Sequence, residues 1–143
     1  MVRTVFVNGE FVSEEKAKVS IFDRGFLFSD SVYEVTTVLE GKLVSWVGHI
    51  DRLKRSLTRL KIVIPFDEET LLSLHRKLIK LNDLSDGLIY MQVSRGSAER
   101  DFSIKENLKP SLILFSQKID LLDPSRLNRC LKVITVPETR WRH

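Results

Sequence analysis

Cysteine is almost missing from this sequence of 143 residues. Its one cysteine, Cys130, cannot form an internal disulfide or a cluster of thiolate metal ligands. Long apolar runs are missing too, since stretches such as residues 112–115 are far shorter than a membrane-spanning helix. The first four residues show no sign of the apolar segment of a secretory signal. We therefore expect a cytoplasmic protein.

The sequence also lacks a large excess of one charge. Lysine and arginine number 23 against 19 acidic residues, so the net charge is only +4 and the surface is mixed. This balance mildly favours anionic ligands such as phosphates and carboxylates. With 43% hydrophobic and 29% charged residues, the composition is typical of a soluble globular protein and argues against disorder as its main state.

Several common site motifs have no match. We find neither a P-loop nor a glycine-rich dinucleotide fingerprint, and no serine lies in a nucleophile elbow. The three histidines have no metal-ligand spacing to partners, so no metal site is expected.

The patterns that are present alternate between turns, strands and helices. Asn8-Gly9 and Glu40-Gly41 predict the turns of two hairpins. Apolar residues at helical spacing predict a helix from about residue 47 to 60, and Asp67 is the expected N-cap of a second. The oxygens of residues 29–31 are also possible helix caps. The remaining expected elements are a loop at 13–18 and strands at 88–94, at 112–115 (buried on both faces, or nearly so) and from 131. A short helical turn is expected after residues 123–125.

This order predicts an α+β fold, in which a mostly antiparallel sheet packs against two helices. We expect an N-terminal α+β domain over residues 1–118 and a connector over 119–130. Residues 131–143 would then begin a second, C-terminal domain with its first strand. The chain is accordingly interpreted as the truncated N-terminal part of a longer protein.

Four stretches are hard to explain by packing alone. They are residues 23–25 with Tyr33-Glu34, residues 49–53, residues 92–96 with Arg100, and Arg140-Trp141-Arg142. In this order they resemble the motifs of the fold-type IV pyridoxal-phosphate enzymes, the class IV aminotransferases. Within that family the likeness is greatest to the bacterial D-amino-acid aminotransferases. The resemblance extends from about residue 7 to residue 143.

The resemblance implies a role for three residues. Arg52 would bind the phosphate of pyridoxal 5′-phosphate, Tyr33 would line the substrate pocket, and Arg100 would bind the substrate carboxylate across the interface of a homodimer. A guanidinium suits a phosphate because it donates two parallel hydrogen bonds. From the residues alone, each has a plainer interpretation: Arg52 on a solvated basic face, Tyr33 in the core, and Arg100 in a solvated loop. A functional Arg100 should be held by Glu99 or Asp101.

The implied reaction transfers an amino group from D-alanine or a related D-amino acid to 2-oxoglutarate. The Schiff-base lysine of the family would lie beyond residue 143, so no catalytic residue is expected in this chain and the chain alone is expected to be inactive. Two departures stand out: Phe102 replaces a histidine that completes the carboxylate site, and Ser29 and Ser31 replace glycines.

Two other functions stay open at this point. The chain could be a non-catalytic dimerisation or binding module. It could also be a nucleic-acid-binding domain. Few aromatic residues lie among the basic side chains that would bind the nucleic acid, which are Arg52, Lys54, Arg55, Arg59 and Lys61. The aminotransferase interpretation requires that Tyr33 and Arg52 lie on the same side of the folded molecule.

Overall fold

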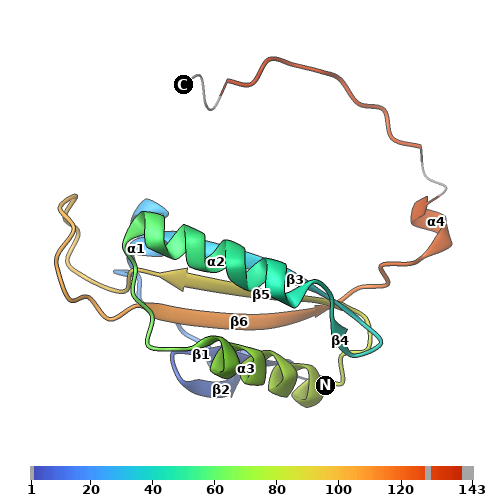
Figure 1. Cartoon of the computed structure of the whole chain (residues 1–143), viewed down its shortest axis with the longest axis horizontal. Helices are drawn as coiled ribbons and strands as arrows, with labels where there is room; N and C mark the ends of the chain where they lie inside the picture. The colour runs from blue at the N-terminus through green and yellow to red at the C-terminus, as the bar shows by residue number, and fades with distance from the viewer. Residues whose placement is uncertain (1, 128–129, 140–143) are drawn as a thin grey trace.

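The computed structural model describes residues 2–127 and 130–139, and its centre is a six-stranded antiparallel sheet with two long helices on one face (Figure 1). The strand order is β2-β1-β6-β5-β3-β4. The strands are β1 (Thr4–Val7), β2 (Glu10–Ser13), β3 (Ser31–Leu39), β4 (Lys42–Leu43), β5 (Gly87–Ser94) and β6 (Ser111–Lys118). The predicted α+β class, with two helices packed on an antiparallel sheet, is confirmed.

Both predicted hairpins form around the expected turns. Asn8 and Gly9 connect β1 to β2, and Glu40 and Gly41 connect β3 to β4. All four residues have positive φ, the backbone conformation that a two-residue hairpin turn of this twist requires. β3 begins earlier than expected, at Ser31, and pairs with β5 over eight residues. Residues 29–31 therefore cap no following helix, because cross-strand pairing takes up this segment.

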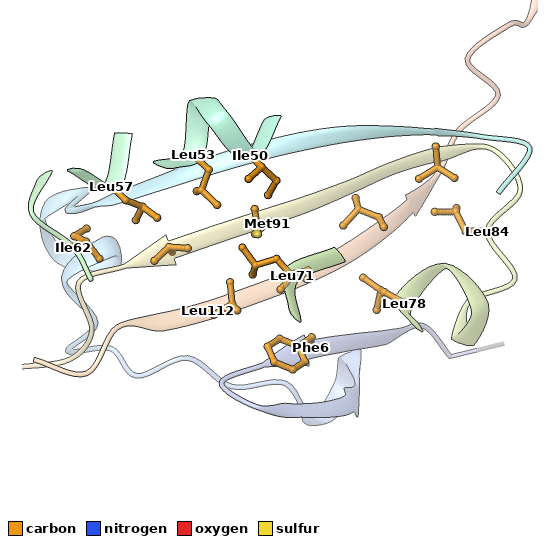
Figure 2. Packing of buried hydrophobic residues seen from close by; sticks show 14 residues of the cluster. Phe6, Ile50, Leu53, Leu57, Ile62, Leu71, Leu78, Leu84, Met91 and Leu112 are labelled. Atoms are coloured by element: carbon orange, nitrogen blue, oxygen red, sulfur yellow. The ribbon is translucent and has the colours of Figure 1, made fainter. Parts of the chain in front are cut away.

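The two long helices are α2 (Trp46–Leu60) and α3 (Glu68–Leu81). The Asp67 carboxylate accepts a hydrogen bond of 2.8 Å from the Thr70 amide, which confirms the predicted N-cap. α2 packs over β3, whereas α3 packs over β1 and β6. Figure 2 shows how apolar side chains from these helices meet those of the sheet. The central members of this core are Phe6, Ile50, Leu53, Leu71, Leu78, Ile89, Met91, Val93, Leu112 and Leu114.

Three shorter helices lie between or after these elements. They are η1 (Glu14–Lys16), a 3₁₀ turn inside the predicted loop at 13–18, α1 (Arg24–Phe28) and α4 (Pro124–Leu127). α4 confirms the short helical turn predicted at this point of the chain. Within the described part of the chain, no helix combines the length and the apolar character needed to cross a bilayer.

The strand predicted at 112–115 lies within β6: Leu112 and Leu114 face the helices and are buried, while Ile113 and Phe115 on the other face are half-buried. One expectation is corrected. Residues 131–136 form no strand, and Leu131, Val133 and Ile134 are exposed. A strand needs a neighbour for its backbone N–H and C=O groups, and none of the residues described here pairs with this segment. The domain boundaries at 118 and 130 stay predictions.

Candidate functional site

The candidate site lies at the outer edge of β3, beside α2. β4 pairs with β3 only at Val38 and Leu39, so the first half of β3 has no strand on its outer side among the residues described. Side chains alternate along a strand. Glu34 therefore points to the helix-covered face, in register with Met91, while Tyr33 points to the opposite face. α2 packs over β3 (Figure 1). It brings His49 and Arg52 to Glu34.

Glu34 is the centre of a small charged cluster. Its carboxylate accepts hydrogen bonds from Arg52 Nε at 2.7 Å and from Arg52 Nη2 at 2.5 Å, and His49 Nδ1 lies 2.8 Å from its Oε2. His49 and Arg52 are three residues apart on α2, the spacing that places two side chains on one helix face. Glu34 is only 2% exposed, whereas the Arg52 side chain is 59% exposed. The cluster therefore has a buried carboxylate beneath an exposed guanidinium.

The charges in this cluster stabilise one another. Burial by itself raises the pKa of Glu34, but hydrogen bonds from Arg52 and His49 outweigh burial and lower that pKa below its ordinary value. Glu34 in turn raises the pKa of Arg52, first through its hydrogen bond and then through its charge, and Tyr33 adds a smaller contribution. Tyr33 and Arg52 thus lie at the same edge of the sheet but on its opposite faces. The requirement that they lie on one side of the molecule is met at the β3 edge and not by the face of the sheet.

Tyr33 stands at the end of a row of aromatic rings on the open face of the sheet. Its ring stacks on Tyr90 with centroids 5.6 Å apart, and Tyr90 stacks on Phe115 at 4.9 Å. The prediction from the residues alone, a core tyrosine, does not match the structure, because Tyr33 is 65% exposed. Its neighbours across the sheet hold the ring in place and leave the side chain accessible to a ligand.

Arg100 lies in the loop between β5 and β6, which leaves the sheet at the same end as the start of β3 (Figure 1). Its guanidinium carbon lies 5.1 Å from the ring centroid of Phe102 and 5.6 Å from that of Phe28. The expectation that Glu99 or Asp101 would hold Arg100 is corrected: aromatic rings hold it, and the Asp101 carboxylate accepts from the Ser103 amide. Among the described residues, no hydrogen bond, ion pair or ring contact joins Arg100 to Tyr33 or Arg52 within one copy of the chain.

Some contributors to the site could be found from sequence and others could not. Glu34 belongs to a quoted motif, but nothing local identifies it as the partner of Arg52, which is 18 residues away. Phe28 as a support for Arg100 has no signal in the sequence. Arg140-Trp141-Arg142 lies outside the described residues. Two of the basic side chains considered for nucleic-acid binding already form salt bridges, Arg52 with Glu34 and Lys54 with Glu68.

The arrangement of Arg52 suits a phosphate. Glu34 occupies Nε and one edge of the guanidinium, while Nη1 has no hydrogen-bond partner among the residues described. An arginine held on one side by a carboxylate can still donate to an anion from its free edge. The described residues include no group of histidine, cysteine and acidic side chains that could hold a metal ion.

Comparison of the whole sequence with known proteins identifies its relatives. The sequence model described as "Amino-transferase class IV" matches residues 31–143. A D-alanine aminotransferase of Staphylococcus aureus (strain MSSA476) is 36% identical over 138 residues, and one from Staphylococcus epidermidis is 38% identical over the same length. Each alignment covers 96% of this chain and 49% of the relative, so the chain spans about half the length of these curated relatives.

Solved structures show the same fold. The branched-chain amino acid aminotransferase of Escherichia coli superposes with a TM-score of 0.77 at 19% identity, covering 83% of this chain and 40% of that one. The 4-amino-4-deoxychorismate lyase of Pseudomonas aeruginosa gives a TM-score of 0.64 at 27% identity, covering 80% of this chain and 39% of that one. A branched-chain amino acid aminotransferase from T.th., complexed with N-(5′-phosphopyridoxyl)-L-glutamate, gives a TM-score of 0.76 at 20% identity, covering 83% of this chain and 41% of that one.

Proposed function

The chain belongs to the class IV aminotransferases, and from that premise we propose that it forms the N-terminal half of a pyridoxal-phosphate enzyme acting on D-amino acids. The proposed reaction moves the amino group of D-alanine or a related D-amino acid to 2-oxoglutarate. The observation that carries this proposal is the Glu34–Arg52 pair beside Tyr33, in a chain that is similar over nearly all its length to D-alanine aminotransferases.

Arg52 is the residue that would hold the cofactor. The family and a neighbour complexed with a phosphopyridoxyl compound imply pyridoxal 5′-phosphate. When bound, this group supplies the electron sink for amino transfer. Glu34 fixes Arg52 from the buried side, so the guanidinium keeps one orientation without losing its free Nη1 edge. His49 lies within hydrogen-bond distance of the same carboxylate and so helps to hold Glu34 in position against Arg52.

Tyr33 and Arg100 would bind the amino acid and the 2-oxo acid. The phenol of Tyr33 can donate a hydrogen bond to a carboxylate, and its ring is held by Tyr90. Arg100 can form two parallel hydrogen bonds to a carboxylate. Because no hydrogen bond, ion pair or ring contact joins Arg100 to Tyr33 or Arg52 in one chain, we propose that it serves the site of a second copy in a homodimer.

A hybrid enzyme tests this proposal. The part of this chain that aligns with the Staphylococcus aureus D-alanine aminotransferase, 138 residues at 36% identity, would replace the matching half of that enzyme. We expect the hybrid to transfer the amino group of D-alanine to 2-oxoglutarate and to leave L-alanine unchanged. The 143-residue chain alone is expected not to transaminate, because the resemblance puts the lysine that carries the cofactor further along than residue 143.

The outcome depends on a hybrid that folds and retains the cofactor. Arg52→Gln should then weaken retention of the cofactor, while Arg55→Gln, on the exposed side of the same helix, should leave it unchanged. A hybrid that is folded, dimeric and loaded with the cofactor but uses L-alanine in preference to D-alanine would contradict the proposed substrate class.

A further inference from the structure

A second cluster of buried charges lies at the end of the sheet from which the Arg100 loop leaves. The Asp30 carboxylate accepts hydrogen bonds from Arg24 Nε at 2.9 Å and from Arg95 Nε and Nη2 at 2.7 and 3.0 Å. Arg24 is only 4% exposed and Arg95 only 7%. Two buried guanidiniums thus share one carboxylate, and nothing in the proposed chemistry above uses any of the three residues.

Arg95 connects this cluster to α2. Its guanidinium also donates to the backbone carbonyl oxygens of Leu60 and Lys61 at 2.7 and 3.2 Å. These carbonyls lie at the C-terminal end of α2, where a positive charge satisfies unpaired acceptors and favours the helix dipole. Asp30 is therefore held in a fixed position relative to the helix that carries Arg52.

Arg24 extends from the same carboxylate to the Arg100 loop. Its Nη1 donates to the carbonyl oxygen of Asp101 at 2.8 Å and to that of Ser103 at 3.3 Å. These two carbonyls flank Phe102. The backbone amide of Arg24 also donates to the carbonyl oxygen of Gly96 at 2.8 Å, near the start of the loop. Arg24 therefore holds the loop at two places, near its start at Gly96 and in its middle at residues 101–103.

The side chain of Arg24 also contacts the ring that supports Arg100. Its guanidinium carbon lies 4.8 Å from the centroid of Phe28, and that of Arg100 lies 5.6 Å from the same centroid. Phe28 packs in turn against Phe102, with centroids 5.6 Å apart. Arg100 is exposed, so without such supports it would lose much side-chain freedom on binding a carboxylate.

We propose that Arg24 is a positioning residue for Arg100, fixing the backbone at residues 101–103 and the Phe28 ring so that the Arg100 guanidinium is oriented before a carboxylate binds. This inference rests on the proposed function insofar as Arg100 binds the substrate carboxylate. It assigns the orientation of Arg100 to a buried Arg–Asp–Arg cluster and two phenylalanine rings. Phe102, which cannot donate a hydrogen bond, thereby acts as a packing surface.

Nuclear magnetic resonance of the 143-residue chain with ¹⁵N-labelled arginine tests the inference. In the native chain, ring currents of Phe28 and Phe102 should shift the Arg100 side-chain signals away from those of Arg59, an exposed arginine on α2. In Arg24→Gln these signals should move to the Arg59 position, and amide exchange at residues 101–103 should rise about tenfold. Arg24→Lys should restore the Asp30 ion pair and only part of the shift. Arg59→Gln should change neither the Arg100 side-chain signals nor the amide exchange at residues 101–103.

A second variant separates positioning from general stability. Phe28→Leu keeps every hydrogen bond of Arg24, so it should reduce the Arg100 shift while exchange at residues 101–103 stays slow. The inference is overturned if folded Arg24→Gln leaves the Arg100 signals unchanged. It is equally overturned if Arg24→Gln is unfolded and Phe28→Leu leaves them unchanged.

Titration with acetate distinguishes this inference from the proposed function. A carboxylate site at Arg100 predicts that acetate shifts the Arg100 signal more than the Arg59 signal, and that Arg24→Gln removes the difference. Equal shifts in the native chain, together with loss of the ring-current shift in Arg24→Gln, would contradict the carboxylate role of Arg100 and support positioning by Arg24.

Discussion

At the scale of single residues, Glu34 is a buried charged side chain that requires hydrogen-bond partners. It lies on the apolar face of the sheet in register with Met91 and Leu114, yet its carboxylate has hydrogen-bond partners on both oxygens. Removing one partner from such a buried group leaves a charge that neither water nor protein satisfies. The same group orients Arg52, so stability and the proposed phosphate site depend on one carboxylate.

Replacing Glu34 with glutamine should therefore destabilise the chain by about 2 kcal/mol, because an amide group would face the N–H groups of Arg52. The free energy of unfolding from urea denaturation measures this loss. Glu68→Gln is the matched control, since its pair with Lys54 is exposed on both sides and should contribute less than about 1 kcal/mol. Equal losses for the two variants would contradict the importance assigned to burial.

His75 sets the pH dependence of stability at mild acidity. It is fully buried, its Nδ1 lies 2.7 Å from the carbonyl oxygen of Leu71, and burial lowers its pKa to about 4. The unfolded chain binds a proton near pH 6.5, whereas the folded chain does so only near pH 4. Stability should fall as the pH drops from about 6.5 to about 4, by about 3 kcal/mol in total.

The Glu34 and Asp30 carboxyls act in a different pH range. Their pKa values are lowered in the folded chain, so the stability they supply is present above about pH 4 and is lost below it. Urea denaturation at several pH values distinguishes the two ranges. In His75→Gln the slope between pH 6.5 and 4 should disappear, and an unchanged slope would show that another group binds the proton.

At the scale of elements, two glycines illustrate why position decides the effect of one substitution. Gly96 follows β5 with φ of +103°, and an added Cβ would lie 2.0 Å from the carbonyl oxygen of Lys109. Gly48 lies inside α2, where an added Cβ meets nothing within 4 Å. Gly96 has the positive φ required at the start of the loop that carries Arg100. Gly48 has no such role, and its lack of a side chain only lowers the stability of α2.

Gly48→Ala should accordingly stabilise the chain by about 1 kcal/mol, since alanine restricts the unfolded chain and favours the helix. Gly96→Ala should destabilise it by more than about 2 kcal/mol through backbone strain and the clash with Lys109. Thermal unfolding of the two variants gives both signs. A Gly96→Ala variant as stable as the native chain would show that the loop can move away from β5.

The elements also show what local sequence can predict. Turn residues such as Asn8-Gly9, the Asp67 cap and the leucine spacing in α2 and α3 each act over a few residues, and those elements form as predicted. The early start of β3 at Ser31 depends on β5, about 60 residues away, so no local pattern marks it. For the same reason Arg52 and Tyr33 could be selected from motifs, while their positioning by Glu34 and Tyr90 could not.

At the scale of the whole molecule, the sheet has two different faces. α2 and α3 cover one face (Figure 1) and bury the core. The opposite face presents the stacked rings of Tyr33, Tyr90 and Phe115. The candidate cofactor residue lies at the edge of the covered face and the candidate substrate residue on the open one. The edge of β3 is where a ligand could reach both.

The most direct measurement of the central claim is a calorimetric titration of the 143-residue chain with pyridoxine 5′-phosphate. This compound has the ring and the phosphate of the cofactor but no aldehyde, so it cannot react with lysines. We predict saturable binding that pyridoxine does not match, that Arg52→Gln weakens by about tenfold, and that Arg55→Gln leaves unchanged. Equal affinity for pyridoxine, or undiminished binding by Arg52→Gln, would contradict the assignment of Arg52 to the phosphate.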